Sequence, residues 1–104
     1  MVMRVHAEQE HDATRVEVAG ELDLSTGGEL QDAVRRAVDE GRERLLVDLG
    51  GVTFIDSAGL GALLGAARTA RAHRTAFGVS CPPGSEARLL IELSGTQQHL
   101  GLED

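Results

Sequence analysis

The chain contains no lysine, tryptophan or tyrosine, and its only aromatic residues are Phe54 and Phe77. Its ten basic residues other than histidine are all arginines, and with 17 acidic residues the formal net charge is −7. Proteins that bind nucleic acids need clustered positive charge for the phosphates and often use aromatic rings to stack on bases. The composition therefore argues against a nucleic acid partner.

Signals for export and membrane insertion are also missing. The first ten residues, MVMRVHAEQE, lack an apolar segment after a basic start, and no run approaches the roughly 18 apolar residues of a membrane span. The single cysteine, Cys81, cannot form an internal disulfide; we expect a small buried residue at a strand end, the alternative being a reactive thiol. We expect a soluble, cytoplasmic chain without membrane insertion, folded as one domain over residues 1–104.

Hydrophobic periodicity predicts strands and helices in alternation after an opening hairpin. Alternating polar and apolar residues predict two strands at Met3–Ala7 and Arg15–Ala19, joined around His11 and Asp12. The later elements are a helix that starts with a Thr26/Glu29 capping box and stops at Gly41, a strand at Arg44–Leu49, a helix at Ser57–His73, a strand at Ala76–Cys81, and a short helix from the cap Ser85 to Leu93, ended by Gly95. This order predicts the α/β class. The expected mixed four-stranded sheet has its second, third and fourth strands parallel and packs with three to four α-helices.

Ser57 lies where the third strand gives way to a helix. Gly50 and Gly51 are expected to break the strand, and the apolar spacing after Ser57 is that of one helix face. Ser57 is therefore expected at the N-cap or in the first turn, where unpaired N–H groups and the helix dipole favour an anion. Asp23 follows the second strand and is expected near Ser57, because sites in such sheets gather at the carboxyl ends of strands. Its alternative role is that of a turn or cap residue.

The helix after Ser57 contains three glycines, each of which costs a helix up to about 1 kcal/mol relative to alanine. Gly65 indicates close packing of the helix. For Gly59 and Gly61 two explanations stay open: close packing, or an open surface for an incoming protein.

Catalytic interpretations of Ser57 fit the sequence poorly. A nucleophile elbow needs G-x-S-x-G, but Ile55 occupies the first glycine position and no motif places a histidine near Ser57. A dinucleotide loop would need a third glycine where Leu64 stands, and no phosphate-binding P-loop motif is present. The four histidines lack metal-ligand spacing. We therefore predict a protein that is not an enzyme and that has no cofactor and no metal site.

Three segments of the chain resemble the STAS domain family, in particular the bacterial anti-sigma factor antagonists. They are GELDLST (20–26), VDLGGVTFIDSAGLGALL (47–64) and ELSG (92–95), and the resemblance spans nearly the whole chain. The D-S-x-G-L-G core after an apolar strand is its most specific part. The resemblance implies a single STAS-like domain in which Ser57 is the phosphoacceptor.

The same resemblance implies a partner switch. The unphosphorylated form would bind an anti-sigma factor that is also an ATP-dependent serine kinase, and so free a sigma factor; phosphorylation would end this binding, and a PP2C-type phosphatase would restore it. The oligomeric state is left open between a monomer and a weak dimer. The partner surface that the resemblance implies comprises Asp23, Asp56, Ser57, Ala58, Gly59, Leu60 and Gly61, the last three as an exposed helix start.

A second hypothesis keeps the fold but changes the role. Some STAS proteins are cytoplasmic subunits that regulate a membrane lipid transporter or an anion transporter. The presence of Asp23, Asp56 and Ser57 together favours the partner switch. The chain departs from the family pattern in residues 72–75, which lack a glycine pair, and in its short polar end from Gln97, which can shape partner choice.

Overall fold

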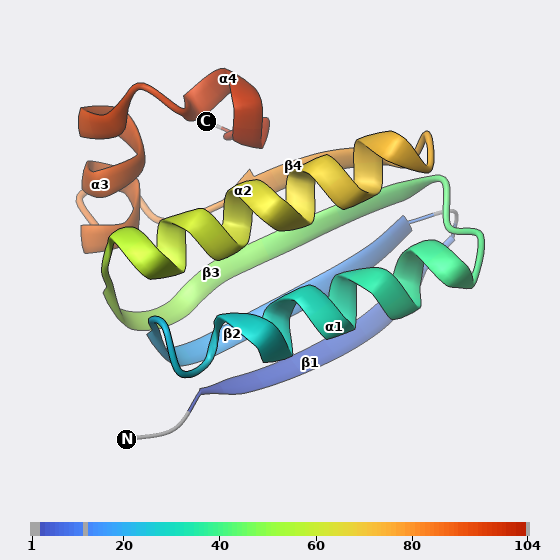
Figure 1. The fold of residues 1–104 in the computed structure, drawn as a ribbon, viewed down its shortest axis with the longest axis horizontal. Helices are drawn as coiled ribbons and strands as arrows, with labels where there is room; N and C mark the ends of the chain where they lie inside the picture. Colours follow the sequence, from blue (N-terminus) through green and yellow to red (C-terminus); the bar gives the residue numbers. More distant parts are fainter. Residues whose placement is uncertain (1–2, 12, 104) are drawn as a thin grey trace.

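A computed structural model describes residues 3–11 and 13–103 as a four-stranded sheet packed with helices (Figure 1). The strands follow the order β1-β2-β3-β4; β1 pairs with β2 antiparallel, and the other two pairings are parallel. The elements along the chain are β1 (Arg4–Glu10), β2 (Ala13–Leu22), α1 (Gly27–Asp39), β3 (Arg44–Ile55), α2 (Ser57–Ala72), β4 (Ala76–Ser80), α3 (Glu86–Ser94) and α4 (Gln97–Leu100). The predicted α/β class, the mixed sheet and the number of helices are confirmed.

One face of the sheet carries α1 and α2, which lie side by side over it (Figure 1). Burial alternates along β2: Val16, Val18, Gly20 and Leu22 are buried, and the residues that alternate with them are more exposed. The helix α1 contributes the stripe expected from its spacing, namely Leu30, Ala33, Val34, Ala37 and Val38. The core therefore lies between this helix pair and one side of the sheet, since successive residues of a strand point to opposite faces.

The glycines Gly50 and Gly51 do not end β3, contrary to our prediction of a strand that stops at Leu49. The strand continues to Ile55, and its pairing with β2 shifts register between Asp48 and Gly51 and again between Val52 and Phe54. A Cβ on Gly51 would lie 2.8 Å from the Cβ of Ala19. Glycine is needed here because the two strands approach closely at an irregularity, which is a common role of glycine inside a strand.

The opening hairpin is longer than predicted. Strand β1 reaches Glu10 and β2 begins at Ala13, so pairing extends into polar, exposed residues that carry no alternation signal. The backbone of His11 takes a positive φ of 53°, as a tight turn requires. Asp12, the other residue expected in this turn, lies outside the described residues.

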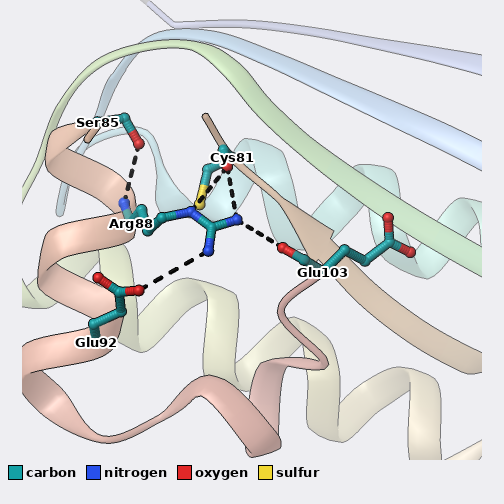
Figure 2. A network of polar contacts seen from close by, with 5 residues as sticks. All are labelled: Cys81, Ser85, Arg88, Glu92 and Glu103. Atoms are coloured by element: carbon teal, nitrogen blue, oxygen red, sulfur yellow. Dashed lines mark hydrogen bonds and ion pairs between the residues drawn. The ribbon is translucent and has the colours of Figure 1, made fainter. Parts of the chain in front are cut away.

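The end of the chain folds back onto the sheet, although its sequence indicated only a short polar segment. Leu100 of α4 is fully buried, and Leu102 forms a parallel bridge with Val79 of β4. Arg88 of α3 holds this segment: its guanidinium donates to the carbonyl of Glu103 at 2.6 Å and to the carbonyl of Cys81 at 3.0 and 3.1 Å (Figure 2). Cys81 itself is buried, as expected, and this burial raises the pKa of its thiol.

Candidate functional site

The candidate site lies where β2 and β3 end at the same edge of the sheet. Leu22 and Ile55, the last residues of the two strands, are paired in the parallel ladder. Asp23 follows Leu22, and Asp56 follows Ile55. The two aspartates therefore lie at the ends of neighbouring strands, which are about 4.8 Å apart in a sheet. The tertiary structure thus brings together the two acidic residues that the sequence separates by 33 positions.

Asp56 caps α2, and Ser57 is the first residue of the helix. The Asp56 backbone is extended (φ −122°, ψ −174°), and its carboxylate accepts a hydrogen bond from the amide of Gly59 at 2.8 Å. Of the two positions expected for Ser57, the first turn is confirmed and the N-cap belongs to Asp56. The Ser57 residue is exposed, and its hydroxyl makes no hydrogen bond within residues 3–11 and 13–103. A partner could therefore reach this hydroxyl directly.

Asp23 organises the loop between β2 and α1. Its Oδ1 accepts hydrogen bonds from the hydroxyl of Ser25 at 2.8 Å and from the amide of Ser25 at 3.0 Å. These bonds to the charged form, led by that of the Ser25 hydroxyl, lower the pKa of Asp23. The turn role that the sequence left open is thus present.

Thr26 does not form the predicted capping box, although α1 does start after it. The Thr26 side chain makes no cap hydrogen bond; its hydroxyl donates to the carbonyl of Glu21 at 2.8 Å and accepts from the amide of Asp23 at 2.9 Å. The hydroxyl is used to close the loop, because the buried end of β2 offers a carbonyl that local sequence cannot reveal. In the same loop the apolar residue Leu24 is 85% exposed, close to Asp23. The hydrophobic periodicity of the sequence did not identify Leu24 as a surface residue.

The two glycines nearest Ser57 have different surroundings, which answers the question that the sequence left open. A Cβ on Gly59 would lie 2.2 Å from the carbonyl oxygen of Leu22, whereas a Cβ on Gly61 would meet nothing within 4 Å. Gly59 is therefore required for packing, and Gly61 lies on an open, exposed surface. The helix start is not exposed throughout as expected: Gly59 and Leu60 are buried and Ala58 is half-buried, because the first turn of α2 packs onto the end of β2.

Gly65 has the packing role that we expected, but it faces α1 and not the sheet. A Cβ there would lie 2.5 Å from the side-chain amide nitrogen of Gln31, which donates a 3.3 Å hydrogen bond to the carbonyl of Ala62. Small residues thus let the two helices approach closely over the sheet.

The arrangement suits binding and modification of a hydroxyl more than catalysis by it. A serine nucleophile needs a base within hydrogen-bonding distance, yet among the described residues no histidine bonds to Ser57. His73 lies at the opposite end of α2, which spans about 24 Å at 1.5 Å per residue. The exposed hydroxyl, the helix N-terminus and the two carboxylates are the chemical groups available at this site.

The chain matches a known domain family and is similar to solved structures of other proteins. A family model described as the Mlab, STAS domain matches residues 5–102. The crystal structure of an anti-sigma factor antagonist from Mycobacterium paratuberculosis is 29% identical, with 97% of this chain and 85% of that chain covered and a TM-score of 0.81. The phosphorylated form of the Bacillus cell fate determinant SpoIIAA is 19% identical, with 97% and 92% covered and a TM-score of 0.70, and shares the fold. No helix in the described part of the chain has the length and hydropathy needed to cross a membrane.

Proposed function

This chain belongs to the STAS domain family, and on that premise we propose that it is an anti-sigma factor antagonist switched by phosphorylation of Ser57. The unphosphorylated protein binds an anti-sigma factor that is also an ATP-dependent serine kinase, and thereby frees a sigma factor in the cytoplasm. A PP2C-type phosphatase removes the phosphate. The similarity to the antagonist from Mycobacterium paratuberculosis supports this role.

The observation that carries the proposal is the exposed hydroxyl of Ser57 at the first position of α2. In the transfer step the Ser57 oxygen bonds to the γ-phosphorus of ATP held by the partner, the bond to ADP breaks, and the hydroxyl proton passes to a base of the partner. This chain supplies the acceptor and the partner surface; it acts as a binding module and not as an enzyme.

The partner surface consists of the residues around this hydroxyl. Asp23 and Asp56 offer two fixed carboxylates, while the exposed Leu24 and Gly61 offer apolar surface for close contact. Leu60 and Gly59, which are buried, contribute by holding the helix start against β2. We assign direct contacts to Asp23, Ser57 and the exposed positions, and a positioning role to the buried ones.

A phosphate on Ser57 would change this surface by charge. The phosphate adds a charge of about −1.5 to −2 and three oxygens that are strong hydrogen-bond acceptors. The amide of Gly59 is already bonded to Asp56, so the phosphate has only the amides of the first two helical residues, Ser57 and Ala58, and the helix dipole to stabilise it. Together with Asp23 and Asp56 it forms a concentrated negative patch. A partner surface fitted to a neutral hydroxyl would then meet like charges and an unpaired dianion.

The experiment measures affinity for the cognate anti-sigma factor with three variants at one position. Ser57→Asp is expected to weaken binding about 10-fold or more, whereas Ser57→Asn, of the same shape but neutral, and Ser57→Ala are expected to bind within a few-fold of the unmodified chain. Ser57→Ala also abolishes the phosphopeptide that mass spectrometry detects after incubation with the partner and ATP. Equal affinities of the Asp and Asn variants, or phosphate on another residue, would contradict the proposal.

The alternative role, in which the chain regulates a membrane lipid transporter or an anion transporter, predicts a different partner. In that case the chain would bind a transporter subunit, and no candidate ATPase from its organism would phosphorylate it. Co-purification of the chain with either class of partner therefore separates the two roles.

A further inference from the structure

Three side chains with metal-binding atoms converge on the sheet face opposite α1 and α2. They are His6, Glu8 and Glu17, and one ligand atom from each lies within 4.8 Å of those of the other two. His6 and Glu17 are direct partners in the antiparallel ladder between β1 and β2, and Glu8 is two residues further along β1, on the same side. The hairpin register creates this trio, which no ligand spacing in the sequence indicates.

We propose that His6, Glu8 and Glu17 bind a divalent transition-metal ion, with Zn²⁺ as the best fit. One imidazole nitrogen and two carboxylate oxygens form a mixed nitrogen and oxygen set, which suits Zn²⁺ and disfavours the all-oxygen preferences of Ca²⁺ and Mg²⁺. The His6 and Glu8 side chains are 67% and 53% exposed, so small rotations can shorten the ligand separations to those of a bound ion. Water would fill the remaining coordination position.

The surroundings of the cluster are compatible with a cation. Two arginines lie near the cluster. Arg15, which pairs with Glu8 across the hairpin, has its guanidinium 2.9 Å from Asp48 and 3.7 Å from Glu10, both outside the trio, and Arg4 lines the hollow beside the cluster. Next to the cluster, a hollow of about 370 Å³ lined by His6, Glu17, Asp48 and other residues gives room for coordinated water. The net charge of −7 further favours binding of a cation over an anion.

His6 Nε2 lies 3.6 Å from a carboxylate oxygen of Glu8, and both side chains are exposed. A surface contact of this kind contributes little to stability, which leaves the site available to a metal.

Isothermal titration calorimetry tests the proposal. Zn²⁺ is titrated into the full chain, without an affinity tag and at slightly alkaline pH. We expect saturable binding of one ion per chain. His6→Ala should weaken it by about 10-fold or more, because the loss of a direct ligand should cost at least as much as the loss of an outer-shell group. The matched control is His99→Ala, which removes another exposed histidine and should leave affinity unchanged.

The glutamates are tested in the same way, with the shape of the side chain retained. Glu8→Gln and Glu17→Gln should each weaken Zn²⁺ binding, while Glu43→Gln, an exposed glutamate outside the trio, should not. Urea unfolding without metal should give the same midpoint for all these variants, because every altered residue is exposed. The proposal is overturned if the unmodified chain shows no saturable binding, or if His6→Ala and His99→Ala bind alike. Neither result bears on phosphorylation of Ser57.

Discussion

Replacement of Gly59 by alanine should destabilise the protein although it lies in a helix, where alanine is normally favoured. The added Cβ would lie 2.2 Å from the carbonyl oxygen and 2.8 Å from the carbonyl carbon of Leu22, where ordinary contacts begin at 3.4 Å. On the other side Cγ1 of Ile55 lies at 3.1 Å. Two of the three neighbouring atoms are backbone at the end of a buried strand, so no side-chain rotation can relieve the overlap.

The magnitude follows from two opposing terms. Overpacking of this kind costs about 3 kcal/mol, the upper part of its usual range, because α2 must move away from β2. Replacing glycine by alanine in a helix returns up to about 1 kcal/mol. The net loss in the free energy of unfolding is therefore about 2 kcal/mol for Gly59→Ala.

Gly61→Ala is the matched control, since it changes the same residue type two positions further along the same helix. Its Cβ would meet nothing within 4 Å, so only the helix term remains and the protein should gain about 0.5 to 1 kcal/mol. Urea unfolding followed by circular dichroism should separate the two midpoints by about 1 to 3 M. If Gly59→Ala proves as stable as Gly61→Ala, the contact between α2 and the end of β2 is wrong, and with it the packing role that we assign to Gly59.

Two further predictions concern the carboxylates of the site. Asp56→Ala should lower the free energy of unfolding by about 1 kcal/mol through loss of the cap to Gly59, whereas Asp56→Asn should retain most of it; equal losses in urea unfolding would argue against the cap. Ser25→Ala should raise the pKa of Asp23 toward its ordinary value of about 3.9, measured by NMR titration of the carboxyl carbon, and an unchanged pKa would contradict the assigned cause. Because folding lowers this pKa, Asp23 stabilises the fold above pH of about 4 and loses that contribution as the pH falls through its folded value; Ser25→Ala should reduce this acid dependence.

Much of the fold follows from the sequence because its signals are local. The apolar stripe of α1, the stop at Gly41 and the Ser85 cap of α3 are patterns within a few residues, and the structure confirms each. Ser57 at the start of α2 was predictable for the same reason, since the change from strand to helix periodicity marks it. The sequence could not assign the cap to Asp56, because serine and aspartate are both good caps.

The rest of the site depends on residues that are distant in the chain. Gly51 looks like a strand breaker until its contact with Ala19 is known, and Leu100 looks like part of a polar tail until it reaches the core. In each case the deciding partner lies on another strand or helix. Local propensity cannot anticipate this, because tertiary packing overrides it.

The class of the fold, the family and the serine on which the proposed switch depends can therefore be predicted from the amino-acid sequence. These are encoded in periodicity and in one contiguous motif, D-S-x-G-L-G, whose residues need no distant partner to be recognised. The folded chain is needed to see which glycine beside Ser57 is buried, that Asp23 and Asp56 follow paired strands, and that His6 meets Glu17 across the hairpin. These contacts depend on strand register, which sets the side chains that meet across a sheet and is fixed only when whole strands pair.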